Sequence, residues 1–258
     1  MEVIIQPNER QATELTAQRI ARLVRAKPDA VLGLATGRSQ LGVYEQLVHM
    51  HREEGLDFSQ VTTFNLDEYI GLGAEHPGSF RHYMQVHLTG CVNVASERVH
   101  VPDGLVADVD AHCAAYEASI TAAGGIDLQL LGIGSDGHIG FNEPSSSLRS
   151  RTRIKTLTAE TQHDNADSFA PGEVPRHVIT MGIGTIMGAR ECLLLALGAR
   201  KAQAVADAVE GPITASVPAS ALQMHPTAKV VLDEAAAGLL KRGSYYKSVY
   251  EGKPDWQR

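Results

Sequence analysis

The chain has few cysteines, few aromatic residues and no long apolar run. Its 258 residues include three cysteines, one tryptophan and 5% aromatic residues. Cys91, Cys113 and Cys192 are widely spaced and form no paired motif, which argues against a disulfide framework or a structural zinc site. No run of about eighteen apolar residues occurs, and the N-terminus lacks the pattern of a signal peptide. We therefore expect a cytoplasmic protein with no membrane partner.

An excess of positive charge is also missing. The chain has 23 Lys and Arg against 30 Asp and Glu, a net charge of -7, and its pI is near 5.9. This balance gives no general affinity for nucleic acid or for an anionic membrane. Hydrophobic residues make up 43% of the chain, which is ordinary for a globular protein with a sizeable core. An anionic ligand must therefore be held by a local site.

Strand and helix patterns alternate from end to end, without a repeat or a proline-rich linker. Helices are expected at 9–26, with Asn8 as the cap, at 41–52, at 76–88 with Pro77 near the first turn, at 108–125 and at 199–211. Strands are expected at 2–5, 31–37, 61–72, 98–101, 126–134, 177–184, 191–198 and 228–233. The pattern predicts an α/β fold: a single Rossmann-like domain over 1–258, with a doubly wound, mostly parallel sheet and helices on both faces.

The stretch LGIGSDGHIGFNEP at 131–144 stands out because three proton-handling side chains leave the end of one strand together. Asp136, His138 and Glu143 follow a buried strand within a glycine-rich segment, whose backbone can approach a ligand closely. In an open α/β sheet, ligands bind at the carboxyl ends of the strands. The alternative is that Asp136 only caps a turn and His138 is a surface histidine. Three titratable groups in one loop favour a site.

Two further segments add anion-binding groups to the same edge of the sheet. The turn at 36–40 offers backbone N–H groups at a helix N-terminus together with Thr36, Gly37, Arg38 and Ser39, a composition suited to a phosphate. Lys201 opens a helix, where a cation opposes the helix dipole, so we expect it beside a bound anion. The turn matches neither nucleotide-binding glycine motif, so a nucleotide is not expected.

An acidic pair, Asp67 and Glu68, ends the strand expected at 61–72. Such a pair is often only a helix cap. It gains importance here because a carboxylate at this edge would lie beside the segments at 36–40 and 131–144.

Five stretches resemble the glucosamine-6-phosphate deaminases in order: GLATG at 33–37, FNLDEYIGL at 64–72, GIGSDGHIGFNEP at 132–144, SRTRIKTLT at 150–158 and LGARKAQAV at 197–205. The third is the most specific. The related 6-phosphogluconolactonases carry a similar GxGxDGH motif but continue with a different sequence in place of FNEP. The matches span nearly the whole chain.

The resemblance implies conversion of glucosamine 6-phosphate and water to fructose 6-phosphate and ammonium, without a metal or an organic cofactor. Asp136, His138 and Glu143 match the residues that open the sugar ring, a task that suits a histidine flanked by carboxylates. Asp67 matches the base that moves a proton from carbon 2 to carbon 1. The turn at 36–40 and Lys201 match the phosphate-binding groups.

The chain departs from the family pattern in two stretches. The phosphate turn usually continues with small residues and a proline, whereas this chain has Arg38, Ser39 and Gln40. The family commonly has a phosphate-contacting arginine in an NARFF-like stretch, where this chain reads NADSF with Asp167. We hypothesise that Arg38 supplies the missing charge, or that the substrate is altered, for example to galactosamine 6-phosphate.

Some family members carry an allosteric N-acetylglucosamine 6-phosphate site between the subunits of a hexamer. Five residues of this chain match it: Ser146, Arg153, Lys155, Thr156 and Tyr245. The resemblance therefore implies a homo-oligomer with a candidate allosteric site. On composition alone, the basic stretch at 149–156 is equally an exposed edge strand.

Three alternatives stay open. A deaminase for another amino sugar phosphate would keep the same residues. A 6-phosphogluconolactonase-like hydrolase needs no carbon 2 base, so Asp67 within FNLDEY counts against it. A non-catalytic sugar-phosphate sensor need not keep Asp67, Asp136, His138 and Glu143 together, and the acidic composition argues against nucleic acid as a partner.

Overall fold

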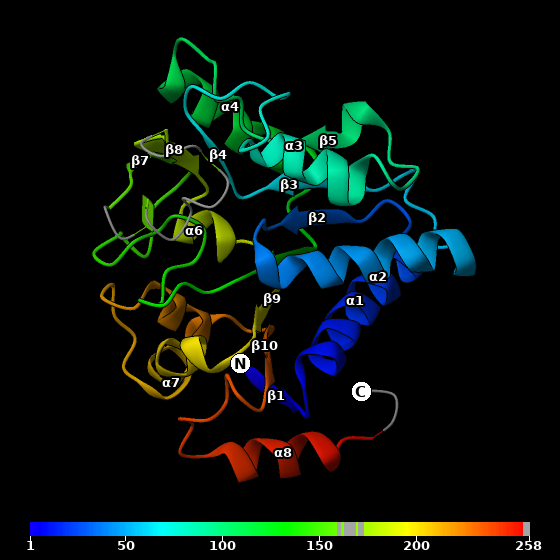
Figure 1. Cartoon of the computed structure of the whole chain (residues 1–258), viewed down its shortest axis with the longest axis vertical. Helices are drawn as coiled ribbons and strands as arrows, with labels where there is room; N and C mark the ends of the chain where they lie inside the picture. Colours follow the sequence, from blue (N-terminus) through cyan, green and yellow to red (C-terminus); the bar gives the residue numbers. More distant parts are fainter. Residues whose placement is uncertain (159–160, 163–168, 170–172, 255–258) are drawn as a thin grey trace.

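The computed structural model describes residues 1–158, 161–162, 169 and 173–254 (Figure 1). Within these residues, seven strands form one sheet in the order β1-β10-β9-β6-β2-β3-β5, and every neighbouring pair is parallel. The strands are β1 (Glu2–Gln6), β2 (Val31–Leu34), β3 (Thr62–Asn65), β5 (Val99–His100), β6 (Leu128–Leu131), β9 (Glu191–Ala196) and β10 (Ala228–Asp233). The predicted parallel α/β fold is confirmed.

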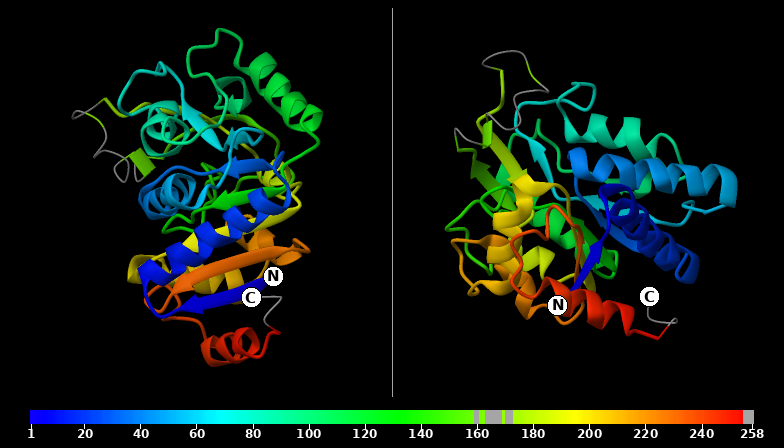
Figure 2. Two further views of the ribbon diagram at one scale, coloured as in Figure 1. Left: turned by 90° about the vertical axis from the view of Figure 1, so that its right-hand side faces the viewer. Right: turned by 60° about the horizontal axis from the view of Figure 1, so that its bottom comes forward.

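Helices cover both faces of this sheet (Figures 1 and 2). One face packs against α1 (Glu9–Ala26) and α2 (Arg38–Glu54), and the other against α4 (Val109–Ala122), α7 (Ala202–Glu210) and the 3-10 helix η5 (Pro218–Met224). The expected cap of α1 is present, since Asn8 accepts a hydrogen bond from the Gln11 backbone N–H. A last helix, α8 (Gly243–Glu251), lies against β1 at the edge of the sheet (Figure 2).

The central strands are apolar on both sides because both of their faces are covered. In β9, Cys192 and Leu194 face the core cluster that includes α4 and α7, whereas Leu193 and Leu195 face α1 and α2. Alternate side chains of a strand point to opposite faces, so a buried parallel strand reads as one continuous apolar run. This is why the strand periodicity of the sequence is weak although the strands themselves are clear.

A second, antiparallel sheet of three strands, β4-β8-β7, stands beside the parallel sheet and corrects the prediction for 61–72. The sequence predicts one strand there. Instead, β3 ends at Asn65 in the large sheet and β4 (Asp67–Tyr69) pairs with β8 (His177–Thr180), which also pairs with β7 (Arg153–Thr156). Leu66 joins the two sheets, since its N–H donates to Leu34 and its carbonyl accepts from Met181. The chain therefore changes sheets immediately before Asp67.

Two predicted helix starts are also wrong. The helix expected from 41 begins at Arg38, directly after the N-cap Gly37, so the anion-binding turn runs into its first turn. The helix expected with Pro77 in its first turn begins later, as α3 (Phe80–Met84). Its N-cap is Ser79, whose hydroxyl accepts from two backbone N–H groups, and the chain continues in the π-helix η1 (Gln85–Thr89). Pro77 therefore precedes the helix.

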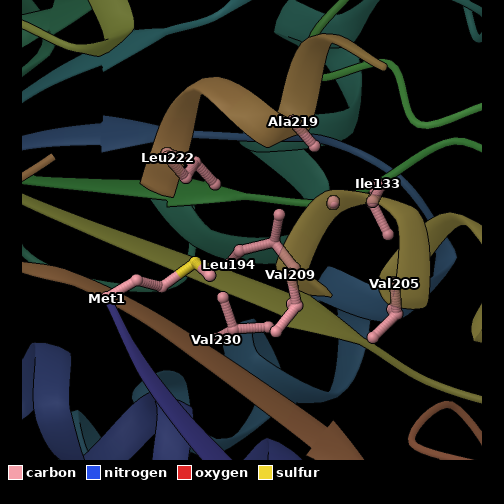
Figure 3. A pocket seen from close by; sticks show the side chains of 9 residues that line it. Met1, Ile133, Leu194, Val205, Val209, Ala219, Leu222 and Val230 are labelled. Atoms are coloured by element: carbon pink, nitrogen blue, oxygen red, sulfur yellow. The ribbon is translucent and has the colours of Figure 1, made fainter. Parts of the chain in front are cut away.

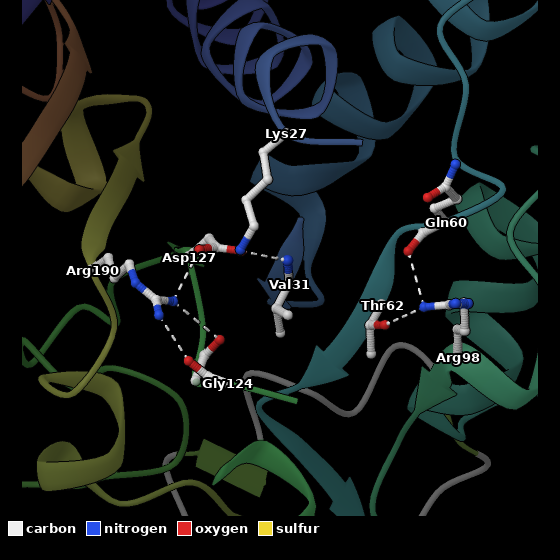
Figure 4. A network of polar contacts seen from close by, with 9 residues as sticks. Lys27, Val31, Gln60, Thr62, Arg98, Gly124, Asp127 and Arg190 are labelled. Atoms are coloured by element: carbon white, nitrogen blue, oxygen red, sulfur yellow. Dashed lines mark hydrogen bonds and ion pairs between the residues drawn. The ribbon is translucent and has the colours of Figure 1, made fainter. Parts of the chain in front are cut away.

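The amino edge of the sheet is closed by a paired carboxylate. Asp127 precedes β6 and accepts hydrogen bonds from Lys27 Nζ at 2.7 Å, the Val31 N–H at 2.8 Å and Arg190 Nη1 at 2.9 Å (Figure 4). Arg190 also donates to the Gly124 carbonyl at 2.8 Å. These contacts join the beginnings of β2, β6 and β9. The hydrogen bonds to the Asp127 side chain therefore stabilise the fold.

All three cysteines are unpaired; Cys113 and Cys192 are buried, and Cys91 is partly exposed. Among the described residues, no helix combines the length and the apolar character needed to span a bilayer.

Candidate active site

The candidate site lies where the order of the sheet reverses. From β2 the chain continues to β3 on one side, whereas from β6 it continues to β9 on the other, and β2 and β6 are neighbours. Such a switch point leaves a crevice at the carboxyl edge of the sheet, which is where ligands bind in this fold class. The two loops that border it are the predicted ones, 35–37 after β2 and 132–144 after β6.

A histidine flanked by two carboxylates occupies the loop after β6. His138 Nδ1 lies 2.7 Å from Asp136 Oδ1 and 3.8 Å from Glu143 Oε2. The His138 backbone N–H also donates to Asp136 Oδ1, which fixes the turn. No described residue bonds His138 Nε2. The imidazole is thus held through one nitrogen and presents the other.

The two carboxylates have opposite pKa shifts. Burial raises the pKa of Asp136, but the hydrogen bonds and the charge of His138 outweigh burial and hold this pKa well below its usual range. Burial raises the pKa of Glu143, and here the hydrogen bond from Thr161 and the charge of His138 offset it only in part. The surroundings therefore favour the ionised form of Asp136 and the protonated form of Glu143.

Glycine is required at two positions of this loop. A Cβ at Gly134 would lie 2.2 Å from His138 Cε1, so the imidazole packs directly on the glycine backbone. Gly140 has a φ of 55°, and a Cβ there would lie 3.0 Å from Thr180 Oγ1 and 3.6 Å from Asp67 Oδ2. The second position brings the loop after β6 against the carboxylate of Asp67.

The acidic pair at 67–68 is divided between two tasks. Glu68 accepts hydrogen bonds from Ser79 Oγ at 2.7 Å and from the backbone N–H groups of Phe80 and Arg81, so it holds the start of α3. Asp67 points the other way along the strand, is 4% exposed, and accepts no hydrogen bond from any described residue. Burial, and secondarily the charge of Glu68, raise the pKa of Asp67 well above its usual value. Only Asp67 is available for chemistry.

The predicted phosphate turn has the backbone of an anion site. Gly37 is the N-cap of α2 with a φ of 119°, and the Tyr83 hydroxyl donates to its carbonyl at 2.8 Å. Arg38 is the first helical residue and is exposed, and Thr36 and Ser39 lie on either side, half-buried. The N–H groups of the first turn of α2 therefore point toward the crevice.

Gln40 and Lys201 flank this turn. Gln40 is 2% exposed, and its Nε2, buried beside Gly132, finds no hydrogen-bond partner among the residues placed in the structure. Lys201 ends the 3-10 helix η4 (Ala199–Lys201) and is the N-cap of α7, which corrects its predicted place inside the first turn. Because η4 follows β9, the neighbour of β6, Lys201 lies at the same edge of the sheet.

The candidate allosteric residues are only partly together within one chain. Arg153, Lys155 and Thr156 lie on β7, and Arg153 Nη1 donates to Asn142 Oδ1 at 2.9 Å, next to Glu143. Ser146 is buried, and its Oγ has no hydrogen-bond partner in the part of the chain that the structure describes. Tyr245 lies on α8, at the opposite end of the molecule from β7 (Figure 1). A single chain therefore does not assemble all five residues.

Sequence reasoning missed two hydroxyls. Thr180 Oγ1 accepts from the Phe141 N–H at 3.1 Å and lies against Gly140, and Thr161 Oγ1 donates to Glu143 Oε1 at 2.5 Å. Neither threonine belongs to a motif with its partner, because strand pairing and the chain reversal after β7 bring them there. Asp167 lies outside the described residues.

We assign no ligand to an apolar cavity and no metal to the histidine loop. A cavity of about 10 Å³ between α7, η5 and the sheet is lined by nine apolar side chains, including Ile133 and Val209 (Figure 3), and offers no polar group to a ligand. We assign no metal to the cluster of Asp136, His138 and Glu143, because an ion on His138 Nδ1 would have to break the 2.7 Å contact with Asp136.

The amino-acid sequence is similar to proteins of known family. A family model described as glucosamine-6-phosphate isomerases/6-phosphogluconolactonase matches residues 7–232. A glucosamine-6-phosphate deaminase of Arthrobacter sp. (strain FB24) is 57% identical over 258 residues, 100% of this chain and 99% of the relative. One from Streptomyces coelicolor is 53% identical over 259 residues, again 100% and 99%.

Solved structures give the same result. The structure of a monomeric glucosamine-6-phosphate deaminase superimposes with a TM-score of 0.90 at 42% identity, covering 93% of this chain and all of that one. A 6-phosphogluconolactonase from Trypanosoma cruzi, at 19% identity and a TM-score of 0.73 over 93% of this chain and 97% of that one, shares the fold alone. The predicted family is confirmed: the chain belongs to the glucosamine-6-phosphate isomerase/6-phosphogluconolactonase family, on its glucosamine-6-phosphate deaminase branch.

Proposed function

We propose that the protein converts glucosamine 6-phosphate and water to fructose 6-phosphate and ammonium. The observation that carries this proposal is the buried Asp67 carboxylate, which has no hydrogen-bond donor among the described residues and lies against Gly140 of the loop that holds His138. Ester hydrolysis has no use for a second, proton-accepting carboxylate at this position. An isomerisation that moves a proton between neighbouring carbons requires one.

The first step is opening of the sugar ring. The ring oxygen must gain a proton while the anomeric hydroxyl loses one, and an imidazole can serve as both the acid and the base for this exchange. Asp136 holds Nδ1, so Nε2 faces the substrate. Glu143, whose pKa burial raises, supplies or accepts a proton beside the imidazole. The three residues thus form one proton-transfer unit.

The second step is proton transfer along the open chain. Asp67 removes the proton from carbon 2, giving an enolamine, and returns a proton to carbon 1. Water then adds to the resulting carbon–nitrogen double bond at carbon 2 and ammonia leaves. Burial raises the pKa of Asp67, and the Asp67 carboxylate is a stronger base for that reason. The phosphate binds at the N-terminus of α2, with Lys201 and Arg38 as cations.

The direct experiment is to measure ammonium and fructose 6-phosphate from glucosamine 6-phosphate, with galactosamine 6-phosphate and 6-phosphogluconolactone in parallel. Turnover of glucosamine 6-phosphate is expected. Turnover of galactosamine 6-phosphate alone would assign a different amino sugar, and lactone hydrolysis alone would overturn the proposal.

Arg38 tests the phosphate part of the proposal. Arg38→Ala should raise KM about tenfold and leave kcat nearly unchanged, because a contact to the phosphate binds ground state and transition state alike. Arg52→Ala, an exposed change at the other end of the same helix, is the matched control. Equal KM values for both variants and the wild type would show that Arg38 does not bind phosphate.

A cytoplasmic location remains a prediction from the composition. A homo-oligomer and an allosteric site at Ser146, Arg153, Lys155, Thr156 and Tyr245 remain predictions from the family resemblance. The placement of Tyr245 far from β7 supports a site shared between subunits rather than one within a chain. The solved relative at 42% identity is described as a monomer. Sedimentation velocity, with and without N-acetylglucosamine 6-phosphate, therefore tests the oligomer and the effector together.

A further inference from the structure

The shortest contact to a carboxylate of the candidate site comes from a residue eighteen positions away in the chain. Thr161 Oγ1 lies 2.5 Å from Glu143 Oε1. Both residues are 5% exposed, so water competes little for this contact. The other carboxylate oxygen, Glu143 Oε2, lies 3.8 Å from His138 Nδ1. The two oxygens of Glu143 thus face different partners.

The direction of the hydrogen bond follows from the carboxylate. An ionised carboxylate oxygen only accepts, so Thr161 Oγ1 donates to Glu143 Oε1. Thr158 Oγ1 accepts the backbone N–H of Thr161 at 3.2 Å and lies 3.0 Å from Thr161 Oγ1, so the Thr158 proton is directed to Thr161 Oγ1. A hydroxyl has one proton to donate. Thr161 therefore receives from Thr158 and directs its own proton to Glu143 Oε1.

We propose that Thr161 is a positioning residue that makes Glu143 Oε1 a hydrogen-bond acceptor and thereby confines the exchangeable proton of Glu143 to Oε2, the oxygen that faces His138. Its meaning for catalysis rests on the proposed function. The hydroxyl relay itself, Thr158 to Thr161 to Glu143, rests only on the contacts above. Thr161 touches no reacting atom in this role.

The segment that carries Thr161 is tied to the small sheet. The Leu157 N–H donates to the Arg176 carbonyl at 2.9 Å, and Gln162 donates through its backbone N–H to Thr158 and through its side chain to Leu157. These bonds set the turn at the end of β7 and with it the place of the Thr161 hydroxyl. The relay therefore links the geometry of this turn to the protonation of Glu143.

Removing the Thr161 hydroxyl should change the pKa of Glu143, and the direction of that change shows whether Thr161 donates to Glu143 or accepts from it. Among the described residues, the titratable groups that act on the Glu143 carboxyl are His138, which lowers its pKa, and Asp136, which raises it. A donor at Oε1 stabilises the ionised form, so its loss must raise the pKa of Glu143. If Thr161 instead accepted a proton from Glu143, its loss would lower that pKa.

The test compares Thr161→Val, which keeps the shape and removes the hydroxyl, with Thr161→Ser, which restores it, and with Thr158→Val. Carbon-13 NMR of the glutamate carboxyl groups follows the titration of Glu143 without any turnover. An upward shift in Thr161→Val, restored in Thr161→Ser and smaller in Thr158→Val, is expected. A downward shift, no shift, or an equal shift in Thr158→Val would overturn the relay.

The same variants give a kinetic readout. In Thr161→Val, kcat/KM should fall about tenfold, and the limb of its pH profile that reports Glu143 should move to higher pH; Thr161→Ser should restore both. An inactive wild-type protein would contradict the proposed function while leaving the NMR result to decide the relay. An active Thr161→Val protein with an unmoved pH profile would contradict the relay alone.

Discussion

Asp127, directly before β6 at the amino edge of the parallel sheet, and Asp67, in β4 just past the carboxyl end of β3, are both buried aspartates with opposite surroundings. Asp127, at the amino edge, accepts hydrogen bonds from two cationic side chains and a backbone N–H (Figure 4). Asp67, at the carboxyl edge, accepts none from the described residues, and burial raises its pKa. A buried carboxylate costs free energy unless it is paired. The comparison separates a carboxylate used for stability from one kept for reactivity.

The cause is the topology of the parallel sheet. At the amino edge, the chain enters the strands from tight connections, and Lys27, Val31 and Arg190 converge on Asp127. At the carboxyl edge, the loops must leave room for a ligand, and glycines occupy the positions where a side chain would fill it. The unpaired carboxylate is therefore a property of the crevice.

The largest expected effect is on activity. Asp67→Asn should lower kcat/KM by roughly 10²–10⁴-fold, since it removes the proposed proton acceptor while keeping the size of the side chain. The measurement is steady-state release of fructose 6-phosphate, with circular dichroism to confirm the fold. Asp127→Asn serves as the control at the other edge and should keep most of its activity per folded molecule. Loss of activity in both variants, or in neither, would contradict the assignment of Asp67 to reactivity and of Asp127 to stability.

The next effect is on stability. Asp127→Ala should lower the free energy of unfolding by roughly 2–4 kcal/mol, because the buried Val31 N–H loses its acceptor and two cations lose their partner. Lys27 and Arg190 are partly exposed, so water recovers part of the ion-pair energy. Urea unfolding at pH 7 measures the change. Asp67→Ala, measured in the same way, should destabilise less; an equal or larger loss would contradict the contrast.

The smallest effect is in the pH dependence of stability. The folded pKa of Asp67 is raised, so between the unfolded and folded pKa values the folded state holds a proton that the unfolded state has lost. Stability due to this group then falls as pH rises, by about 1.4 kcal/mol per pH unit at most, and is constant above the folded pKa. Asp67→Asn lacks this term.

The stability of Asp67→Asn relative to the wild type should therefore increase as pH rises from about 4 and then level off. Urea unfolding of both proteins at several pH values gives the difference. Asp136 has the opposite sign, because its pKa is lowered and its stabilisation is lost only in acid. A difference between the two proteins that stays constant with pH would mean that Asp67 titrates normally.

Local sequence was enough to place the side chains that lie on one loop. Asp136, His138 and Glu143 lie within eight residues that follow one buried strand, so their grouping could be predicted. The parallel sheet could be predicted for a similar reason, since each apolar run is followed by a helix that must cover it. Tyr245, assigned only by resemblance, lies on a helix that one chain keeps far from β7.

The alternation of strands and helices, the family, and the loop with its three proton-handling groups could all be predicted from the amino-acid sequence. Three features could be seen only in the folded chain. The stretch at 61–72 divides between two sheets, Glu68 caps α3 while Asp67 has no partner among the described residues, and Thr161 reaches Glu143. The two groups of features differ in the sequence separation of the residues that interact. Hydrophobic periodicity and glycine turns act between near neighbours, whereas hydrogen-bond partners and pKa shifts depend on groups that only the folded chain brings together.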